Sequence, residues 1–492
     1  MILYILGLVI GFEGVFMALP CITALLYGEA EGVAFLIVML ICLLIGILSI
    51  LLRPKKNTNI FAREGFVIVS LSWFMMSLFG ALPYTINGDI PHFVDALFEM
   101  VSGFTTTGSS ILSDVEALSH ASMIWRSFSH WIGGMGVFVF MMAVLPLIGG
   151  QNIHLMRAES PGPTVGKLVP KVKNTAMLLY GIYFVMTVVQ ILLLLVGGVN
   201  LFDSLCLSFG TAGTGGFAIL NSGIATYSPY VQYVITIFMI LFGVNFNVYF
   251  FLLIRKFKDA FRHEEMRWYL TIIASAVLLI TINLRNLYPT LEEAFRHAFF
   301  QVGSIITTTG YATTDFNYWP VPSQAILVLL MFIGACAGST GGGFKVSRVI
   351  LLVKSIFKEM ECFVHPRSVR KIKMDGRQVE GDTVRSVSVY LVVYLCLFIG
   401  SFFVICLDEF DLVTNFTATA SALNNIGPGL QVVGPMGNYG AFSDVSKIVL
   451  IFDMLAGRLE LFPVLLLFYP GTWKYTGITS GIRHALHRKQ GE

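Results

Sequence analysis

The stretch SIITTTGYATTDF, residues 304–316, sets a string of threonines and a glycine, TTTGYA at 307–312, between long apolar segments. Aligning the chain with itself finds three related strings: TTTGSS at 105–110, AGTGGF at 212–217 and NNIGPG at 424–429. The fourth residues of the four strings are Gly108, Gly215, Gly310 and Gly427, which recur about every 100 residues. One such string would be weak evidence, but four in register predict four structural repeats.

Composition places these strings in a membrane protein. Hydrophobic residues make up 56% of the 492 residues and charged residues only 12%, against about 25% charged in a soluble domain. Apolar runs long enough to cross a bilayer are predicted at 2–27, 32–52, 64–84, 123–148, 175–198, 229–254, 267–284, 323–353, 387–407 and 445–469. The first run lacks a basic start and a convincing cleavage site, so we interpret it as a span and not as a signal peptide.

Charged residues indicate the orientation. Lys and Arg cluster in alternate connections, at 53–63, 157–173, 255–267, 345–385 and 474–489, whereas the other connections are acidic. By the positive-inside rule, both termini are predicted to be cytoplasmic. The seven cysteines have no metal-type spacing, and we expect them to be free thiols.

Four shorter, moderately apolar segments remain on the acidic, outer side: 92–104, 201–210, 291–305 and 411–423. Each is too short to span and suits a re-entrant helix that turns back within the membrane. An unpaired backbone amide or carbonyl in lipid costs several kcal/mol. The polar strings that follow these helices should therefore line an aqueous path.

The expected fold is an all-α membrane protein, with two extra N-terminal helices and four helix–pore loop–helix repeats around a pseudo-fourfold pore. Its expected parts are two N-terminal transmembrane helices (1–60), pore repeat 1 (61–150), pore repeat 2 (151–263), pore repeat 3 with a glycine-rich gating loop (264–358), a cytoplasmic loop with pore repeat 4 (359–473), and a cytoplasmic tail (474–492).

The residue types in the strings suit a filter built from backbone carbonyls. Glycine reaches left-handed conformations without steric penalty, and small Thr and Ser side chains let four loops converge. Rings of carbonyl oxygens can replace the hydration shell of a cation about the size of K⁺. Acidic outer loops raise the concentration of cations at the mouth. The pattern therefore predicts a path for monovalent cations.

The four strings resemble those of the bacterial Trk/Ktr/HKT superfamily of potassium uptake proteins, as do GACAGSTGGGFKVSRV at 334–349 and AGRLELFPVLLL at 456–467. The two extra N-terminal spans and the length are similar to its TrkH/TrkG type. The resemblance covers essentially the whole chain, and it implies K⁺ as the transported ion because all four strings keep a glycine at the fourth position. It also implies a homodimer in a bacterial cytoplasmic (inner) membrane.

Carried over by position, the resemblance implies sixteen carbonyl ligands. They are Thr106, Thr107, Gly108 and Ser109; Gly213, Thr214, Gly215 and Gly216; Thr308, Thr309, Gly310 and Tyr311; and Asn425, Ile426, Gly427 and Pro428. The fourth loop departs most from the others, since Ile426 has no hydroxyl and Pro428 has a fixed φ. We expect that quadrant to bind the ion less well.

A glycine-rich segment interrupts the third repeat. GACAGSTGGGFK at 334–345 holds Gly334, Gly338, Gly341, Gly342 and Gly343, followed by Lys345. A continuous helix is improbable there because each glycine costs about 1 kcal/mol relative to alanine, so we expect a flexible loop on the cytoplasmic side of the filter. The resemblance implies that it is an intramembrane gate. A glycine face for tight helix packing is the alternative, and a phosphate-binding loop is disfavoured because no Ser or Thr follows Lys345.

Arg458 is an ionisable residue inside the last apolar span, and such a residue is a functional candidate by default. The resemblance places it in the pore below the filter, where it could be an electrostatic barrier that pairs with the glycine-rich loop. The alternative is a structural ion pair with Glu460 or another buried acid.

The cytoplasmic stretch 354–386 is the longest charged segment of the chain. It could serve orientation alone or bind anionic membrane lipid. The resemblance implies that it docks a cytosolic nucleotide-binding regulatory subunit of the TrkA type, since this chain has no Rossmann or Walker motif. We expect no organic cofactor and no nucleic-acid partner.

Two other classes of function were weighed. An ion-coupled K⁺/H⁺ or K⁺/Na⁺ symporter would use carboxylates at mid-membrane, of which the chain offers few: Glu13, Asp453 and Glu460. A membrane-embedded enzyme is disfavoured because no catalytic motif is present. We expect Glu13 and His130 to serve assembly, though the role of Glu13 is left open, as are those of Asp95, Glu99, Asn245 and Asn247.

Overall fold

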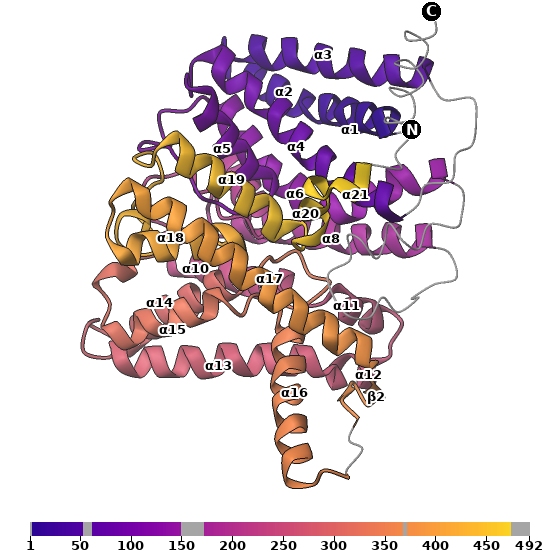
Figure 1. Cartoon of the computed structure of the whole chain (residues 1–492). Coiled ribbons are helices and arrows are strands. Elements are labelled where there is room, and N and C mark those ends of the chain that lie inside the picture. The colour runs from indigo at the N-terminus through magenta and orange to yellow at the C-terminus, as the bar shows by residue number, and fades with distance from the viewer. Residues whose placement is uncertain (1, 53–61, 149–171, 368–370, 474–492) are drawn as a thin grey trace, which may run out of the picture.

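The computed structural model describes residues 2–52, 62–148, 172–367 and 371–473, and these ranges are mostly helical (Figure 1). The described strands, β1 (Lys373–Met374) and β2 (Arg377–Gln378), have two residues each and pair antiparallel in a small hairpin. The expected all-α class is confirmed.

Three helices precede the repeats: α1 (Ile2–Phe16), α2 (Ala18–Tyr27) and α3 (Gly32–Leu51). α1 and α2 together form one candidate membrane span, and α3 forms another. Glycines let α1 and α3 approach closely, because a Cβ built on Gly11 would lie 2.9 Å from the Cα of Gly46. This small-residue contact is typical of helix pairs in membranes.

Four repeats follow, each with a short helix between longer ones. The first is α4 (Ala62–Asn87), α5 (Phe93–Phe104) and α6 (His120–Ile148). The second is α8 (Val172–Val196), α9 (Leu201–Gly213), α10 (Pro229–Phe242) and α11 (Phe246–Leu253), with α12 (Phe257–Arg262) after it. The third is α13 (Glu264–Leu284), α14 (Leu291–Ile306), α15 (Val321–Met331) and α16 (Val346–Val364). The fourth is α17 (Gly381–Ile405), α18 (Leu412–Asn424), α19 (Asp444–Arg458) and α20 (Phe462–Phe468), with α21 (Pro470–Trp473) at its end.

The short helices α5, α9, α14 and α18 match the segments expected to be re-entrant. Three of them begin at a residue whose side chain accepts a backbone N–H of the first turn: Asn200, Thr290 and Asp411. Such caps satisfy amides that the helix leaves unpaired. Each short helix ends directly at one of the four polar strings.

Three of the expected apolar runs are interrupted in the structure, one of them at the glycine-rich segment, where the sequence predicted a break. The run 229–254 bends by 91° between α10 and α11, where the side chain of Asn245 caps α11. The run 323–353 is broken by the glycine-rich segment between α15 and α16. The run 445–469 is broken where Glu460 and Leu461 take positive φ, just before Pro463 in the first turn of α20.

Fewer helices than expected are therefore long and apolar enough to cross a membrane. Within the described ranges there are six, or seven if the bent pair α10 and α11 counts as one span. Six of the ten expected spans correspond to these helices, and α6 (His120–Ile148) also runs unbroken through the expected span 123–148. The remaining three are the interrupted runs 229–254, 323–353 and 445–469.

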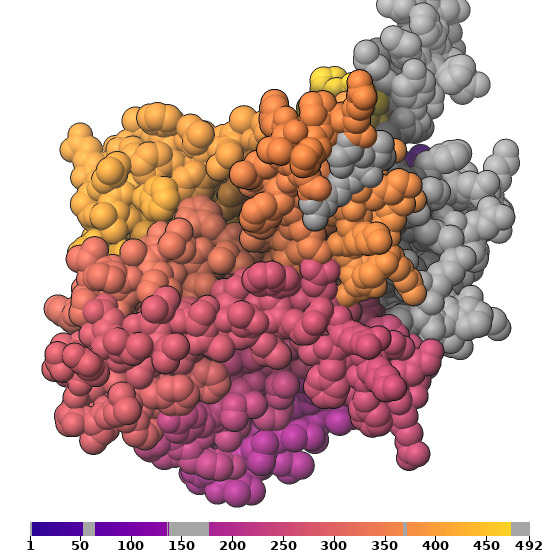
Figure 2. All heavy atoms as spheres, turned by 90° about the horizontal axis from the view of Figure 1, so that it is seen from below, coloured from indigo at the N-terminus to yellow at the C-terminus, as the bar shows by residue number. Residues whose placement is uncertain are grey.

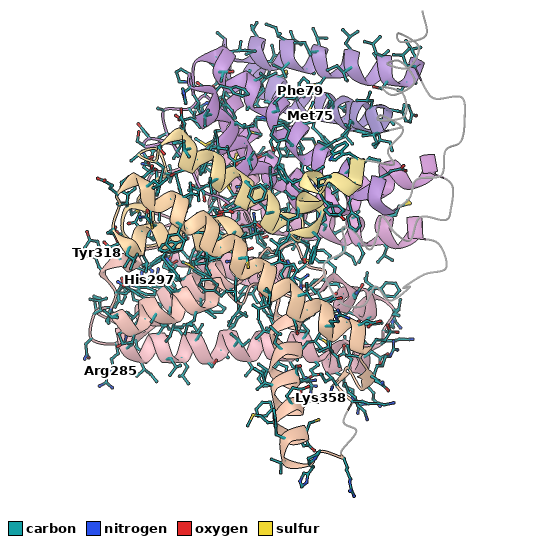
Figure 3. All side chains as sticks on the ribbon, viewed as in Figure 1. Met75, Phe79, Arg285, His297, Tyr318 and Lys358 are labelled. Atoms are coloured by element: carbon teal, nitrogen blue, oxygen red, sulfur yellow. The ribbon has the colours of Figure 1, made fainter. Side chains whose placement is uncertain are left out.

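The long helices lie side by side, and α16 projects from them crosswise (Figure 1). Seen from below, the molecule presents residues of the second, third and fourth repeats, coloured magenta through orange (Figure 2). Arg285 and Tyr318 point away from the bundle at one end, and Lys358 lies on the projecting α16 (Figure 3).

We predict that Gly46→Leu destabilises the N-terminal helix pair, because the new side chain would meet the backbone of Gly11 on α1. Overpacking of this kind costs about 1–3 kcal/mol. The apparent melting temperature in detergent measures the effect. Gly400→Leu is the matched control, since Gly400 is also helical and has no atom within 4 Å of its built Cβ. Equal melting temperatures for the two variants would contradict this packing.

Candidate ion pathway

In each of the four strings, the chain leaves the short helix through a residue in the left-handed conformation. These residues are Thr106, Thr214, Thr308 and Asn425, with φ of 55°, 55°, 59° and 55°. Each donates its N–H to the carbonyl three residues before it: Gly103, Thr211, Ile305 and Ala422 respectively. The four loops thus begin with the same turn, which confirms that they are structural repeats.

A second left-handed residue follows two positions later. In the four loops this residue is Gly108, Gly216, Gly310 and Gly427, with φ of 82°, 77°, 86° and 103° respectively. One residue separates the two left-handed residues of each loop. Its N–H donates to the carbonyl five residues earlier at 2.8–3.0 Å, and in the four loops it is Thr107, Gly215, Thr309 and Ile426. Alternating left-handed residues are the conformation that glycine makes accessible.

This register corrects the expectation for the second loop. Gly216, not Gly215, is equivalent to Gly108, Gly310 and Gly427. The four residues expected to offer carbonyls there, 213–216, start one position early, because Gly213 still belongs to α9. The string GTGG at 213–216 allows either alignment, so only backbone conformation could resolve it.

The four loops close on one another in a ring. A Cβ built on each left-handed glycine would lie less than 3.0 Å from a carbonyl oxygen of the next loop. The contacts run from Gly108 to Gly215, from Gly216 to Thr309, from Gly310 to Ile426, and from Gly427 to Thr107. Segments far apart in sequence thus meet around one axis, and no side chain fits at these four positions.

The fourth loop differs from the others in the partners of its glycine carbonyl, that of Gly427. The oxygen of Gly427 accepts hydroxyl donors from Ser109 (3.2 Å), Ser421 (2.7 Å) and Tyr439 (2.9 Å). A carbonyl has two lone pairs, so this acceptor is saturated by protein. The oxygen of Gly427 is thus bonded within the protein, and its expected role as an ion ligand stays a prediction. The Tyr311 carbonyl is also engaged, by Ser304 at 2.6 Å.

His130 of α6 contacts the second loop through its imidazole ring. Its Nδ1 lies 2.8 Å from the carbonyl oxygen of Gly103, and its Nε2 accepts the backbone N–H of Phe217 at 3.2 Å. The ring therefore joins the end of α5 to the residue after Gly216. This position agrees with the expected role of His130 in assembly.

The glycine-rich segment lies directly against two of the loops. The N–H of Gly342 donates to the Thr308 hydroxyl at 2.6 Å. A Cβ on Gly341 would lie 2.9 Å from the Thr307 carbonyl oxygen, and one on Gly342 would lie 2.8 Å from that of Asn424. The segment breaks the helix, as expected, and two of its glycines, Gly341 and Gly342, are required by close approach to the third and fourth loops.

Two buried charged residues hold the segment in shape. Lys345 has a φ of 75° and folds back so that its Nζ donates to the carbonyls of Gly341 and Gly342. Glu265 of α13 accepts two backbone N–H groups at one oxygen, from Ala337 at 2.7 Å and from Ser347 at 3.0 Å. Sequence reasoning missed Glu265, because nothing in its local pattern marks it as a partner of residues more than 70 positions away.

Arg458 reaches both the segment and the first repeat. Its guanidinium donates to the carbonyl of Thr340 and to that of Gly133 of α6, each at 2.8 Å. Glu460, the acid expected as its alternative partner, pairs with Arg348. The geometry thus agrees with a pairing of Arg458 with the glycine-rich segment.

Other polar residues left open by the sequence now have assigned surroundings. Asn245 caps α11 by accepting the N–H of Asn247. Asp95 pairs with Lys447 at 2.6 Å and Glu99 pairs with Arg126 at 2.6 Å. Glu13 lines an apolar cavity of about 50 Å³, and within the described part of the chain neither of its carboxylate oxygens has a hydrogen-bond partner.

Comparison with known proteins assigns most of the chain to one family. Residues 31–475 match the family model described as TrkH, a cation transport protein. The chain belongs to the TrkH family. It is therefore a membrane-embedded cation transporter and not an enzyme.

Several relatives cover nearly all of the chain. The Trk system potassium uptake protein TrkH of Salmonella typhimurium is 38% identical over 95% of this chain and 97% of its own length. The Trk system potassium uptake protein TrkG of Escherichia coli is 32% identical over 95% of this chain and 97% of its own length. The crystal structure of the potassium transporter TrkH from Vibrio parahaemolyticus superposes with a TM-score of 0.86 at 31% identity, over 96% of this chain and 99% of that one.

We predict that Glu265→Ala frees the glycine-rich segment. Hydrogen bonds to a charged acceptor contribute about 1.5–3 kcal/mol each, so the amides of Ala337 and Ser347 should exchange with deuterium at least about tenfold faster. Hydrogen exchange of the purified protein measures this. Glu264→Ala is the control, because Glu264 pairs with Lys354 outside the segment. Unchanged exchange in Glu265→Ala would rule out the bond pattern.

Proposed function

We propose that this chain is the potassium-conducting subunit of a bacterial uptake system, and that it conducts K⁺ in the manner of a channel. The observation that carries the proposal is the closed ring of four glycine-centred loops. Backbone carbonyls around one axis can replace the hydration shell of K⁺. The names of the relatives, which describe potassium uptake proteins of Trk systems, support the choice of ion.

The four loops contribute unequally to the proposed filter. The first three offer the carbonyls around Thr107 and Gly108, around Gly215 and Gly216, and around Thr309 and Gly310. The fourth contributes less, because hydroxyl groups saturate the oxygen of Gly427. At the outer mouth, a hydrogen bond from the Asn221 amide lowers the pKa of Asp114 below its usual value. That carboxylate therefore stays ionised and attracts cations.

We predict that Gly310→Ser weakens the preference for K⁺ and Rb⁺ over Na⁺ by about tenfold or more. The new Cβ would collide with the Ile426 carbonyl, and φ at this position is 86°. Ion competition in proteoliposomes measures the ratio. Gly181→Ser on α8 is the control, since it has open space around its built Cβ. A wild-type protein that does not distinguish K⁺ from Na⁺ would refute the proposed function.

The glycine-rich segment at 334–345, with Lys345 and Arg458, is the proposed gate. It lies against the third and fourth loops, and the Arg458 guanidinium joins it to α6 of the first repeat. A fixed positive charge beneath a cation filter raises the energy of an ion that leaves the filter. The proposed gate thus combines a steric and an electrostatic barrier.

We predict that Arg458→Gln raises K⁺ flux several-fold, because it removes the positive charge and weakens the hold on the segment. Single-channel current or flux in proteoliposomes measures the effect. Arg285→Gln is the matched control, because Arg285 lies exposed at the end of α13 and points away from the bundle (Figure 3). Unchanged conductance and gating in Arg458→Gln would count against the barrier.

We further propose an inner-membrane location with cytoplasmic termini, a homodimer, and a cytosolic nucleotide-binding regulatory subunit. The orientation is supported by the basic connections, and by α1 beginning and α21 ending at the same end of the bundle (Figure 1). The relatives are named as parts of a Trk system, which supports a further subunit. α16 follows the proposed gate without interruption, so a partner bound to it could act on the gate directly.

A further inference from the structure

A buried ion pair lies behind the first two filter loops. Glu99 is on the short helix α5 and Arg126 is on α6. The Arg126 Nε donates to the Glu99 Oε1 at 2.6 Å, and their side chains are 2% and 0% exposed. Sequence reasoning left Glu99 open, and it did not consider Arg126. Neither residue lies on the proposed ion path.

The carboxylate of Glu99 holds the end of the first loop. Its Oε1 accepts the Ser110 hydroxyl at 3.0 Å, and its Oε2 accepts the backbone N–H of Ile111 at 3.0 Å. Ser110 is the last residue of the first filter string, 105–110, and Ile111 directly follows it. Both oxygens of the carboxylate are thus committed to the loop and to Arg126.

The guanidinium of Arg126 holds the second loop. Its Nη1 donates to the Ala218 carbonyl at 2.8 Å, and its central carbon lies 3.6 Å from the centroid of the Phe217 ring. Phe217 and Ala218 directly follow Gly216, the left-handed glycine of that loop. One ion pair therefore connects the ends of two neighbouring loops, and it reaches the equivalent positions Ser110 and Ala218.

The connection belongs to the first repeat alone. With the register defined by the loop backbones, the positions equivalent to Glu99 are Leu207, Gln301 and Ala418. Gln301 makes a neutral and longer bond, from its Nε2 to the Thr314 carbonyl at 3.4 Å. Charge-assisted bonds are about twice as strong as neutral ones, so the connection made by Glu99 is stronger than the bond made by Gln301 at the equivalent position of the third repeat.

We propose that Glu99 and Arg126 are positioning residues that set the distance between the first and second filter loops, and through it the discrimination between K⁺ and the smaller Na⁺. The proposal rests on the proposed function. Neither side chain touches the ion; each acts through the backbone of the loop that it binds. Without the pair, those loops could close around an ion of another size.

The test is the K⁺ over Na⁺ flux ratio in proteoliposomes, measured for wild type, Glu99→Gln and Asp95→Asn. Glu99→Gln keeps the size of the side chain and removes its charge, so we expect the ratio to fall at least about tenfold. Asp95→Asn is the matched control. It breaks an ion pair with Lys447 one helical turn earlier on α5, and that pair does not contact the loops, so the ratio should stay at the wild-type value.

A wild-type protein without K⁺ preference would refute the proposed function. A selective wild type with an equally selective Glu99→Gln would refute the positioning role alone. Because breaking a buried pair on one side leaves an uncompensated charge, Glu99→Gln could fail to fold. The double variant Glu99→Gln with Arg126→Gln leaves no unpaired charge. We expect it to be stable and poorly selective, and wild-type selectivity in it would overturn the proposal.

Discussion

The structure depends on one constraint: four stretches of non-helical backbone must sit at membrane depth without side chains between them. Each left-handed glycine leaves room for a carbonyl of the neighbouring loop, and the four contacts close into a ring. A backbone group in lipid has no water to bond, so the short helices, the hydroxyl residues and the surrounding long helices all serve to enclose this ring. The N-terminal helices and the acidic connections are additions to that arrangement.

The ring is fourfold in backbone conformation but not in chemistry. The first two loops are joined by a buried ion pair, the third and fourth rest on the glycine-rich segment, and the fourth has its glycine carbonyl saturated by hydroxyl groups. Repeats fused in a single chain can diverge in this way, whereas identical subunits cannot. The pathway therefore combines a symmetric backbone ring with an asymmetric surrounding.

Much of this could be predicted from the sequence, because glycine strings, apolar runs and basic connections are local patterns. The four short helices and the glycine-rich interruption lie where they were expected. The register of the second loop could not be found, since GTGG at 213–216 fits two alignments. The break at Glu460 and Leu461 is a matter of backbone conformation without a glycine to mark it. The partners of Glu265 and Arg458 lie more than 70 positions away along the chain, so only the folded structure brings them together.

Glu265 has a consequence for how the glycine-rich segment can move. One carboxylate oxygen binds the amides of both Ala337 and Ser347, near the two ends of the segment. Both ends are thus bonded to one atom on α13, and the backbone N–H of Val346 also bonds the carbonyl of Ala335, so the ends are joined to each other as well. A displacement of α16, which begins at Val346, therefore cannot shift one end of the segment without straining the other.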